Sequence, residues 1–206
     1  GQNCSAISRV IIDKSRADEL REALLFQTSQ FHQGNPLDPV NRLGVLVSDN
    51  HFNKVKSYLD QGNKDDFIKL CGDVNTKEKR ITPTIFDQVD PKHALARDEV
   101  FGPVLSLIIA ADTDHAVQIA NDTNYGLTAS VFSASIGTAL RSARILKAGT
   151  VTVNCYGEGD ISTPFGGWKE SGFGGRDNGL AAHDQFTETK TIWINLDDPL
   201  DENYIE

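Results

Sequence analysis

Residues 103–154 read PVLSLIIAADTDHAVQIANDTNYGLTASVFSASIGTALRSARILKAGTVTVN, and this stretch alternates short apolar runs with segments of helical periodicity. Three apolar runs are typical of buried strands: residues 103–111, 128–133 and 149–154. Two segments between them are predicted to be helices: residues 112–124 and 135–147. Such alternation predicts an α/β fold, with a mostly parallel sheet, flanking helices and right-handed crossovers.

Upstream of this stretch, the pattern predicts three more strands and two more helices. In chain order they are a strand at residues 9–13, helices at residues 16–32 and 49–61, and strands at residues 67–71 and 82–86. Ser15 and Asp18 resemble a capping box at the start of the first helix. Gly62 is the expected stop of the second helix.

The last predicted element is the strand TKTIWINL at residues 189–196, in which Ile192 and Ile194 alternate with Trp193. It follows a loop at residues 157–179 that holds eight of the 17 glycines of the chain. A strand without an obvious crossover partner must still satisfy its backbone groups. We therefore expect this strand to pair with a neighbouring subunit.

The composition restricts the partners and the compartment. A chain of 206 residues is long enough for one substantial core. Its 29 acidic and 20 basic residues give a net charge of −9, which argues against nucleic acid and membranes as partners. The longest apolar stretch, residues 104–111, is too short to span a bilayer. Three widely spaced cysteines and five scattered histidines indicate no disulfide framework and no metal site, so we expect a cytoplasmic protein.

Cys4 is the first candidate for chemistry. Cysteine is among the most buried residue types, and Cys71 and Cys155 fit core packing because each lies beside or within an apolar run. Cys4 instead lies between Asn3 and Ser5, with no apolar alternation around it. A thiol just before a strand can be exposed at the rim of a sheet, where loops carry active sites.

Two loops are the other candidates. Residues 97–104, RDEVFGPV, place Asp98 and Glu99 before a sharp turn, as a solvated acidic loop or as part of a site. Phe101 fits either a role in that site or a plug over the core. The segment after Asn154 is rich in glycine, which permits close approach of a backbone to a ligand but is also common in plain flexible loops. It contains neither common nucleotide-phosphate motif.

Five motifs follow one another at fitting separations. They are GQNC at residues 1–4, RDEVFGPV at 97–104, NYGL at 124–127, AGTVTVNCY at 148–156 and PFGGWKESGFGGR at 164–176. In this order they resemble the C-terminal, catalytic half of the NAD(P)-dependent aldehyde dehydrogenase superfamily. The resemblance implies an incomplete catalytic domain at residues 1–184, an oligomerisation strand at 185–196 and an acidic tail at 197–206. It also implies a homo-oligomer, either a dimer or a dimer of dimers.

The resemblance assigns a role to each candidate residue. It implies that the Cys4 thiolate attacks an aldehyde carbonyl, and that the resulting thiohemiacetal passes hydride to NAD or NADP and becomes a thioester, which water hydrolyses. The backbone N–H of Cys4 corresponds to an oxyanion donor. Glu99 corresponds to the residue that binds the nicotinamide ribose, and Phe101 to the residue packed against that end of the cofactor. Phe165 corresponds to an aromatic wall of the substrate tunnel.

The sequence also departs from the family pattern. In the family, a glutamate general base, an oxyanion-hole asparagine, the cofactor domain, and one strand and one helix of the catalytic half precede the cysteine, and none of them is present here. Residues 42–46 read RLGVL where the family commonly has Gly-Pro-Leu, and GFGGR at residues 172–176 carries an extra glycine. We therefore expect the 206 residues alone to be inactive, as a truncated form of a longer enzyme.

The substrate class is predicted from the loop at residues 156–162, which corresponds to the substrate-anchoring loop of the family. Glu158 and Asp160 lie in this loop, and carboxylates near a tunnel mouth favour a substrate with a cationic tail. The segment also resembles the aminoaldehyde and γ-glutamyl-aminobutyraldehyde branch. We therefore expect an aminoaldehyde substrate, with simple solvation of the two carboxylates as the alternative.

Two other classes of function compete with this interpretation. The chain could be a non-catalytic oligomerisation or interaction module that is derived from the family. A cysteine hydrolase or acyl carrier would need a histidine partner for Cys4, and the scattered histidines offer no local support for one.

Overall fold

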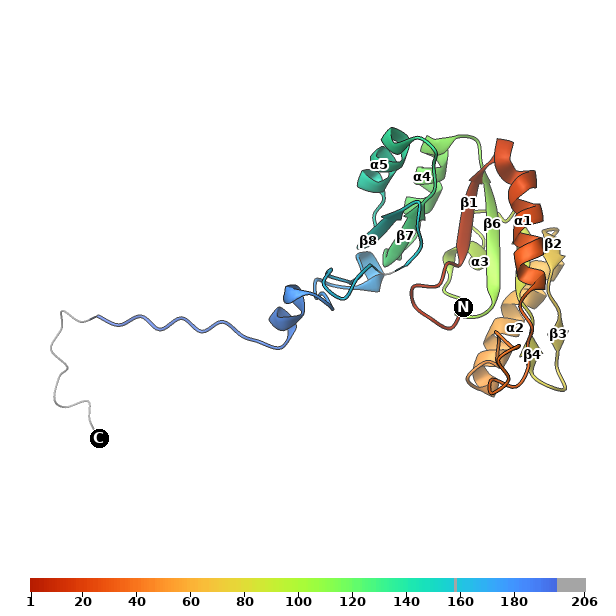
Figure 1. Cartoon of the computed structure of the whole chain (residues 1–206), viewed down its shortest axis with the longest axis horizontal. Helices are drawn as coiled ribbons and strands as arrows, with labels where there is room; N and C mark the ends of the chain where they lie inside the picture. Colours follow the sequence, from red (N-terminus) through yellow and green to blue (C-terminus); the bar gives the residue numbers. More distant parts are fainter. Residues whose placement is uncertain (158, 196–206) are drawn as a thin grey trace.

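The computed structural model describes residues 1–157 and 159–195, and its central element is a four-stranded sheet (Figure 1). The strands, in spatial order, are β1 (Arg9–Asp13), β6 (Val104–Ala110), β5 (Thr84–Asp87) and β2 (Ile68–Cys71). β1, β6 and β5 run parallel, and β2 runs antiparallel to β5. A short hairpin of β3 (Val74–Asn75) and β4 (Arg80–Ile81) joins β2 to β5. β2 runs antiparallel to β5 because the connection between them is this hairpin and contains no crossover helix.

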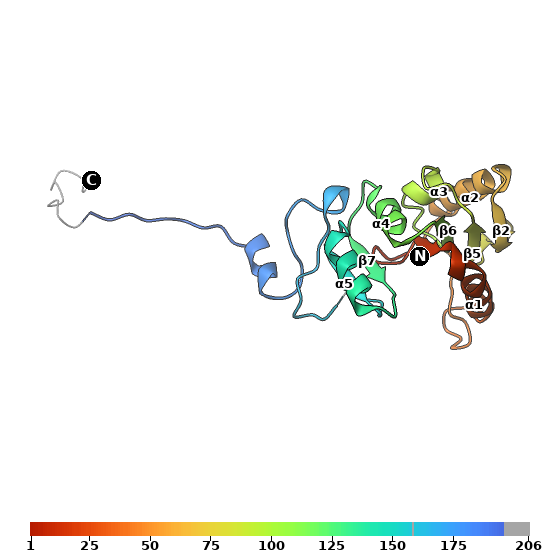
Figure 2. The same cartoon turned by 90° about the horizontal axis from the view of Figure 1, so that it is seen from above.

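Helices cover both faces of this sheet. They are α1 (Ala17–Ser29), which follows the 3₁₀ turn η1 (Lys14–Arg16), α2 (Asp49–Lys64), α3 (Ala94–Arg97) and α4 (Thr113–Asn121). α2, α3 and α4 lie on one face and α1 on the other (Figure 2). Phe52, Val55 and Leu59 of α2 are at most 5% exposed and belong to the main core with Phe86 of β5. Among the described residues, no helix is long and apolar enough to cross a membrane.

Two predicted helix boundaries are wrong. Gly62 does not end α2 but lies buried in its last turn, where a Cβ atom would be 2.7 Å from Leu95 Cδ1. Glycine is needed there because the helix approaches its neighbours closely. Ser15 and Asp18 form no capping box: the Asp13 carboxylate accepts a 2.8 Å hydrogen bond from the Ser15 N–H and caps η1 instead.

The regular stretch that predicts the fold forms the expected elements but not one continuous sheet. β7 (Thr128–Val131), α5 (Ile136–Ile145) and β8 (Thr150–Val153) follow α4, and β7 and β8 run parallel. This pair is a separate two-stranded sheet. β1 and β7 each pair along one edge only, and their other edges line the same cleft. The expected α/β fold with helices flanking a mostly parallel sheet is confirmed, and in the described residues β7 and β8 form a sheet of their own.

After β8, the helical elements of the described residues are two short 3₁₀ turns, η2 (Lys169–Ser171) and η3 (Leu180–Gln185). Residues 186–195 then extend away from the rest of the molecule (Figure 1). They are not assigned as a strand, and Trp193 is 91% exposed. A strand needs a partner, and none is supplied by the described residues of this chain. The role of residues 185–196 in oligomerisation stays a prediction, and the predicted tail at 197–206 lies outside the described residues.

Candidate active site

Cys4 lies at an exposed turn that its neighbours hold in place. The Ala6 N–H donates to the Asn3 carbonyl at 3.0 Å, which closes a turn around Cys4 and Ser5. The Asn3 side-chain oxygen accepts from the Ser5 N–H at 2.9 Å and from the Ser5 hydroxyl at 2.7 Å. Ser5 is buried while Cys4 is exposed, so the turn presents the thiol to the outside.

Tyr156 also contacts this turn from the far end of the sequence. Its hydroxyl donates to the Ser5 carbonyl at 3.2 Å. Tyr156 follows β8, so the bond joins the predicted substrate-anchoring loop to the residue after Cys4. Sequence patterns could not reveal this contact, because it links positions 151 residues apart.

The acidic loop at residues 98–102 is held by one side of α2. His51 Nε2 donates to the Phe101 carbonyl at 2.6 Å, Lys54 Nζ to the Glu99 carbonyl at 2.9 Å, and the Tyr58 hydroxyl to the Asp98 carboxylate at 3.0 Å. The Phe101 backbone has a positive φ of 59°, a strained conformation for a large residue that needs such support. Each of these three α2 residues comes directly before one of the buried residues Phe52, Val55 and Leu59. They therefore share the same helical spacing, which could have indicated a common face.

The Cys4 turn and the acidic loop meet at their backbones. A Cβ atom on Gly1 would lie 1.9 Å from the Gly102 carbonyl oxygen. A Cβ atom on Gly102 would in turn lie 2.8 Å from Val55 Cγ2 in the core. The GQNC segment therefore rests directly on the turn that follows Phe101, and both glycines permit the close approach.

Cys4, Glu99 and Phe101 line one cavity of about 1010 Å³, together with Tyr125 and Tyr156. The cavity continues along the free edges of β1 and β7. The structure thus brings the predicted nucleophile and both predicted cofactor residues together. The exposed carboxylate of Glu99 suits hydrogen bonds from ribose hydroxyls, and the Phe101 ring suits packing against a flat ring system, so these residues fit the nicotinamide end of NAD(P).

Phe165 and Asp160 do not line this cavity. Phe165 is half-buried and exchanges two backbone hydrogen bonds of 2.7 Å with Asp177, which close the base of the loop between them. Asp160 is exposed, and its Oδ1 accepts from the Ser162 hydroxyl at 2.6 Å and from the Ser162 N–H at 2.9 Å. These bonds lower the pKa of Asp160, so it stays a carboxylate at neutral pH. Glu158 lies outside the described residues.

Negative charge gathers at the cavity beside Tyr125. Burial raises the pKa of the Tyr125 hydroxyl, and the charges of Glu99, Glu170 and Asp98 raise it further. Burial also raises the pKa of Tyr58, and its bond to Asp98 adds to the effect. These acidic groups favour a cation beside Tyr125, while Arg9, Arg97 and Lys147 also line the cavity. Among the described residues, no cluster of three histidine, cysteine or acidic side chains could hold a metal ion.

The other two cysteines differ from each other. Cys71 is half-buried at the end of β2, and its thiol lies 3.6 Å from the Pro83 carbonyl oxygen, to which it donates. Burial raises the pKa of the Cys71 thiol. Cys155 is exposed, so the prediction of core packing is wrong for this residue. It lies two residues beyond the end of β8, outside the apolar run that suggested burial.

We expect iodoacetamide to alkylate Cys4 at least about 5-fold faster than Cys71 at pH 7.5, because the thiolate is the reacting form and a raised pKa leaves less of it. As the pH increases, Cys71 should begin to react at a higher pH than an ordinary thiol. Peptide mapping by mass spectrometry measures both rates on the intact chain, with Cys155 as the exposed reference. Equal rates for Cys4 and Cys71 throughout the titration would contradict this prediction.

Comparison with known proteins places these features in a family context. The sequence matches the aldehyde dehydrogenase family over residues 1–192. It is 51% identical over 195 residues to an aminoacetaldehyde dehydrogenase of Pseudomonas aeruginosa, and this match covers 95% of the chain and 39% of that enzyme. It is 43% identical over 197 residues to the NADP/NAD-dependent aldehyde dehydrogenase PuuC of Escherichia coli, covering 96% and 40% of the two chains.

The fold is also similar to that of solved structures, over nearly the same share of each chain. An indole-3-acetaldehyde dehydrogenase in complex with NAD⁺ superposes with a TM-score of 0.90 at 41% identity, covering 95% of this chain and 40% of that one. The α/β architecture is therefore that of a solved protein with bound dinucleotide. The chain spans about 40% of the length of the relatives it matches.

Proposed function

Because the chain belongs to the aldehyde dehydrogenase family, we propose that Cys4 is the nucleophile of an NAD(P)-dependent aldehyde oxidation to which this chain contributes the cysteine-bearing domain. The observation that carries the proposal is the common cavity of Cys4, Glu99 and Phe101. A thiol held in a turn by neighbouring hydrogen bonds is pre-oriented for attack on a carbonyl in that cavity.

The reaction proceeds through covalent intermediates on Cys4. Its thiolate sulfur forms a bond to the aldehyde carbon, and the electron pair of the C=O bond moves to oxygen and gives an alkoxide. The backbone N–H of Cys4 donates to this oxyanion. NAD(P) bound beside Glu99 and Phe101 would supply the hydride acceptor. Loss of hydride from the carbon of the alkoxide leaves a thioester on Cys4. Water then adds to the thioester carbon, and the carboxylic acid and the Cys4 thiolate are released.

The proposal requires groups beyond these 206 residues. The family resemblance puts the general base, the oxyanion-hole asparagine and the cofactor domain before the cysteine. It puts a strand and a helix there too, and the free edges of β1 and β7 support this part of the proposal, because a strand between them would satisfy both. Residues 185–196 are proposed to pair with a second subunit, as the exposed Ile192, Trp193 and Ile194 support.

An aminoaldehyde is the proposed substrate. The exposed carboxylate of Asp160 and the negative charge beside Tyr125 both favour a cationic tail on the substrate. The similarity to an aminoacetaldehyde dehydrogenase supports the same class. Glu158 belongs to the same proposed anchoring loop by its position in the sequence.

A chimera tests the proposal, with residues 1–206 in place of the matched part of the Pseudomonas aeruginosa aminoacetaldehyde dehydrogenase. We expect NAD(P)-dependent oxidation of 4-aminobutyraldehyde with a kcat/KM at least about 5-fold above that of butyraldehyde. Asp160→Asn should lower this ratio by about 3-fold, in the range of exposed ion pairs. Asp114→Asn, an exposed acid in the first turn of α4, is the matched control and should leave the ratio unchanged.

The outcomes separate the two parts of the proposal. Equal kcat/KM for the two aldehydes would remove the aminoaldehyde assignment and leave the oxidation intact. A folded chimera that oxidises no aldehyde would overturn the catalytic role and favour the oligomerisation module.

A further inference from the structure

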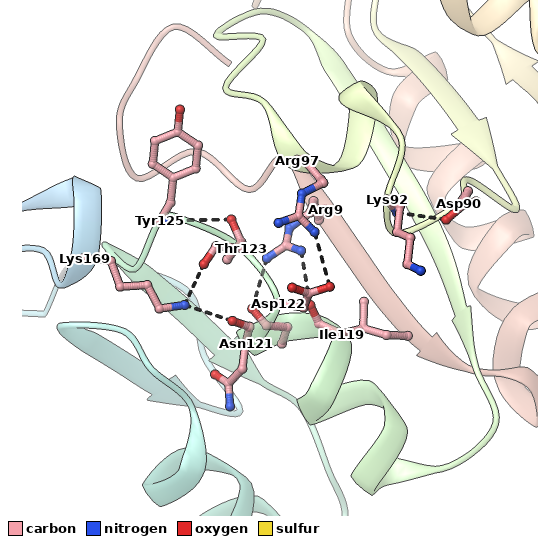
Figure 3. A network of polar contacts seen from close by, with 11 residues as sticks. Arg9, Asp90, Lys92, Arg97, Ile119, Asn121, Asp122, Thr123, Tyr125 and Lys169 are labelled. Atoms are coloured by element: carbon pink, nitrogen blue, oxygen red, sulfur yellow. Dashed lines mark hydrogen bonds and ion pairs between the residues drawn. The ribbon is translucent and has the colours of Figure 1, made fainter.

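The carboxyl end of α4 is bound by two cationic side chains from distant parts of the chain (Figure 3). Arg9 of β1 donates to the carbonyls of Ile119 and Ala120 at 3.3 and 3.1 Å. Lys169 Nζ donates to the carbonyls of Asn121 and Thr123 at 2.9 and 2.7 Å. The last carbonyls of a helix have no partner within the helix and carry its negative end, so cations are favoured there.

Lys169 belongs to a segment that wraps around the turn after α4. The Trp168 N–H donates to the Gly126 carbonyl at 2.8 Å, and the Glu170 N–H donates to the Asn124 carbonyl at 3.0 Å. The Gly126 N–H donates to the Ser171 hydroxyl oxygen at 3.1 Å. Backbone and side chain of residues 168–171 thus fasten the loop that carries Phe165 to the end of α4.

The backbone of Lys169 is strained in a way that its side chain explains. Its φ is 55°, in the left-handed region that non-glycine residues rarely adopt. Glycine would adopt this conformation without strain but would lack the ammonium group. The strained lysine therefore indicates a use for the side chain at this position, and the two carbonyls show what that use is.

The same helix end contacts the other two parts of the candidate site. Asp122, the residue after α4, pairs with Arg97 at 3.2 Å, and Arg97 precedes the loop that contains Glu99. Arg9 lies in β1, directly after the segment that carries Cys4. Arg9, Arg97 and Lys169 thus all contact the end of α4 or the residues directly after it (Figure 3). They come from the segments that carry the nucleophile, the cofactor loop and the Phe165 loop.

Several cations gather at this point. Burial lowers the pKa of the Lys169 ammonium, and the charges of Lys147 and Arg9 lower it further, whereas Asp122 raises it. Burial also lowers the pKa of Arg9, and the charge of Arg97 lowers it further. These repulsions oppose the arrangement, so the helix carbonyls and Asp122 are what hold the cations together.

We propose that Lys169 is a positioning residue, whose ammonium binds the end of α4 and thereby fixes the Phe165 loop relative to Cys4 and Glu99. This inference rests on the proposed function for the roles of Cys4 and Glu99, and on the predicted role of Phe165 as a wall of the substrate tunnel. The contacts themselves belong to the 206-residue chain and are measured without any reaction.

Hydrogen exchange on the 206-residue chain tests the ammonium contact. Lys169→Met removes the charge and keeps a long stem, Lys169→Gly removes both side chain and strain, and Lys169→Arg keeps a cation. We expect the amides of Trp168 and Glu170 to exchange about 10-fold faster in the first two variants and near the wild-type rate in the arginine variant. Lys147→Met removes a nearby charge and is the control that should not change exchange at these amides.

Three results would show that the ammonium contact does not protect these amides. The first is wild-type exchange in Lys169→Gly, because the backbone conformation alone would then be sufficient for protection. The others are no recovery of protection in Lys169→Arg and equal acceleration of exchange in Lys147→Met. Circular dichroism confirms that each variant is folded before exchange is measured.

The chimera tests the positioning role. Loss of folded protein lowers kcat and leaves KM unchanged, whereas a misplaced Phe165 loop raises the KM for the aldehyde. We expect Lys169→Met to raise this KM by about 5-fold and Lys169→Arg to stay within about 2-fold of wild type. An unchanged KM together with faster exchange would refute positioning. A wild-type chimera without activity would refute the proposed function instead, and the exchange result would still decide the contact.

Discussion

Replacing Cys4 with alanine is expected to abolish aldehyde oxidation by the chimera, lowering kcat/KM by at least about 10³-fold, as is usual when the nucleophile of a covalent mechanism is removed. Without the sulfur no thiohemiacetal forms, and the aldehyde has no alkoxide from which hydride can leave. The loss should appear in kcat, because the cavity and its other lining residues are unchanged. Steady-state NAD(P)H absorbance measures the effect, and Cys4→Ser should lose activity as well because a hydroxyl is far less nucleophilic.

The other two cysteines supply the controls for this experiment. Cys155→Ala removes a second exposed thiol, and Cys71→Ala removes a half-buried one. Both should keep kcat/KM within about 3-fold of wild type if the folded fraction is the same. Mass spectrometry of the acid-quenched reaction should find the acyl adduct on the peptide that contains Cys4. An undiminished rate in Cys4→Ala, or an adduct on Cys155, would refute the mechanism.

The elements of the fold follow largely from local periodicity. The apolar runs and helical spacings of residues 103–154 predict β6, α4, β7, α5 and β8 in the correct order, because each pattern reflects one buried face. The separation of β7 and β8 from the main sheet could not be predicted in this way. Which strands pair depends on contacts between segments that are distant in sequence, and periodicity carries no information about them.

Errors at the helix ends have a related cause. Gly62 was expected to end α2, yet a glycine is needed there because Leu95 of another helix approaches the backbone closely. Asp13 caps the turn before α1 in place of the expected Ser15, since both residues are good caps and the backbone geometry decides between them. Local chemistry identified the right residue types at both ends but not what they contact.

The candidate site was predictable from the motifs only in part. The family resemblance placed Cys4, Glu99 and Phe101 in one site, and the structure finds them on one cavity. It did not reveal that His51 supports the strained Phe101 backbone, because that hydrogen bond joins residues 50 positions apart. Phe165 and Asp160, predicted as substrate residues, lie off the cavity in the described part of the chain, and their roles stay predictions.

The largest effect on stability is expected at Arg21, which neutralises a buried carboxylate. Asp87, at the end of β5, is 1% exposed, and Arg21 Nε of α1 donates to its Oδ2 at 2.6 Å. Within the described residues, this carboxylate also accepts a 2.8 Å hydrogen bond at Oδ1 from the Gln88 N–H. Arg21→Met keeps much of the stem packing but leaves the charge of Asp87 buried without a cation.

We expect Arg21→Met to lower the free energy of unfolding by about 3 kcal/mol, because breaking a buried ion pair from one side leaves an uncompensated charge. Urea denaturation of the 206-residue chain, followed by circular dichroism, measures the change. Arg16→Met is the matched control, since Arg16 pairs with Glu19 at the surface, where the side chains are 64% and 69% exposed, and its midpoint should not move. If Arg21→Met unfolds at the same urea concentration as Arg16→Met, then the Arg21–Asp87 pair does not contribute to the stability of the fold. Arg21→Met with Asp87→Asn should recover part of the loss, because the neutral amide no longer needs a cation.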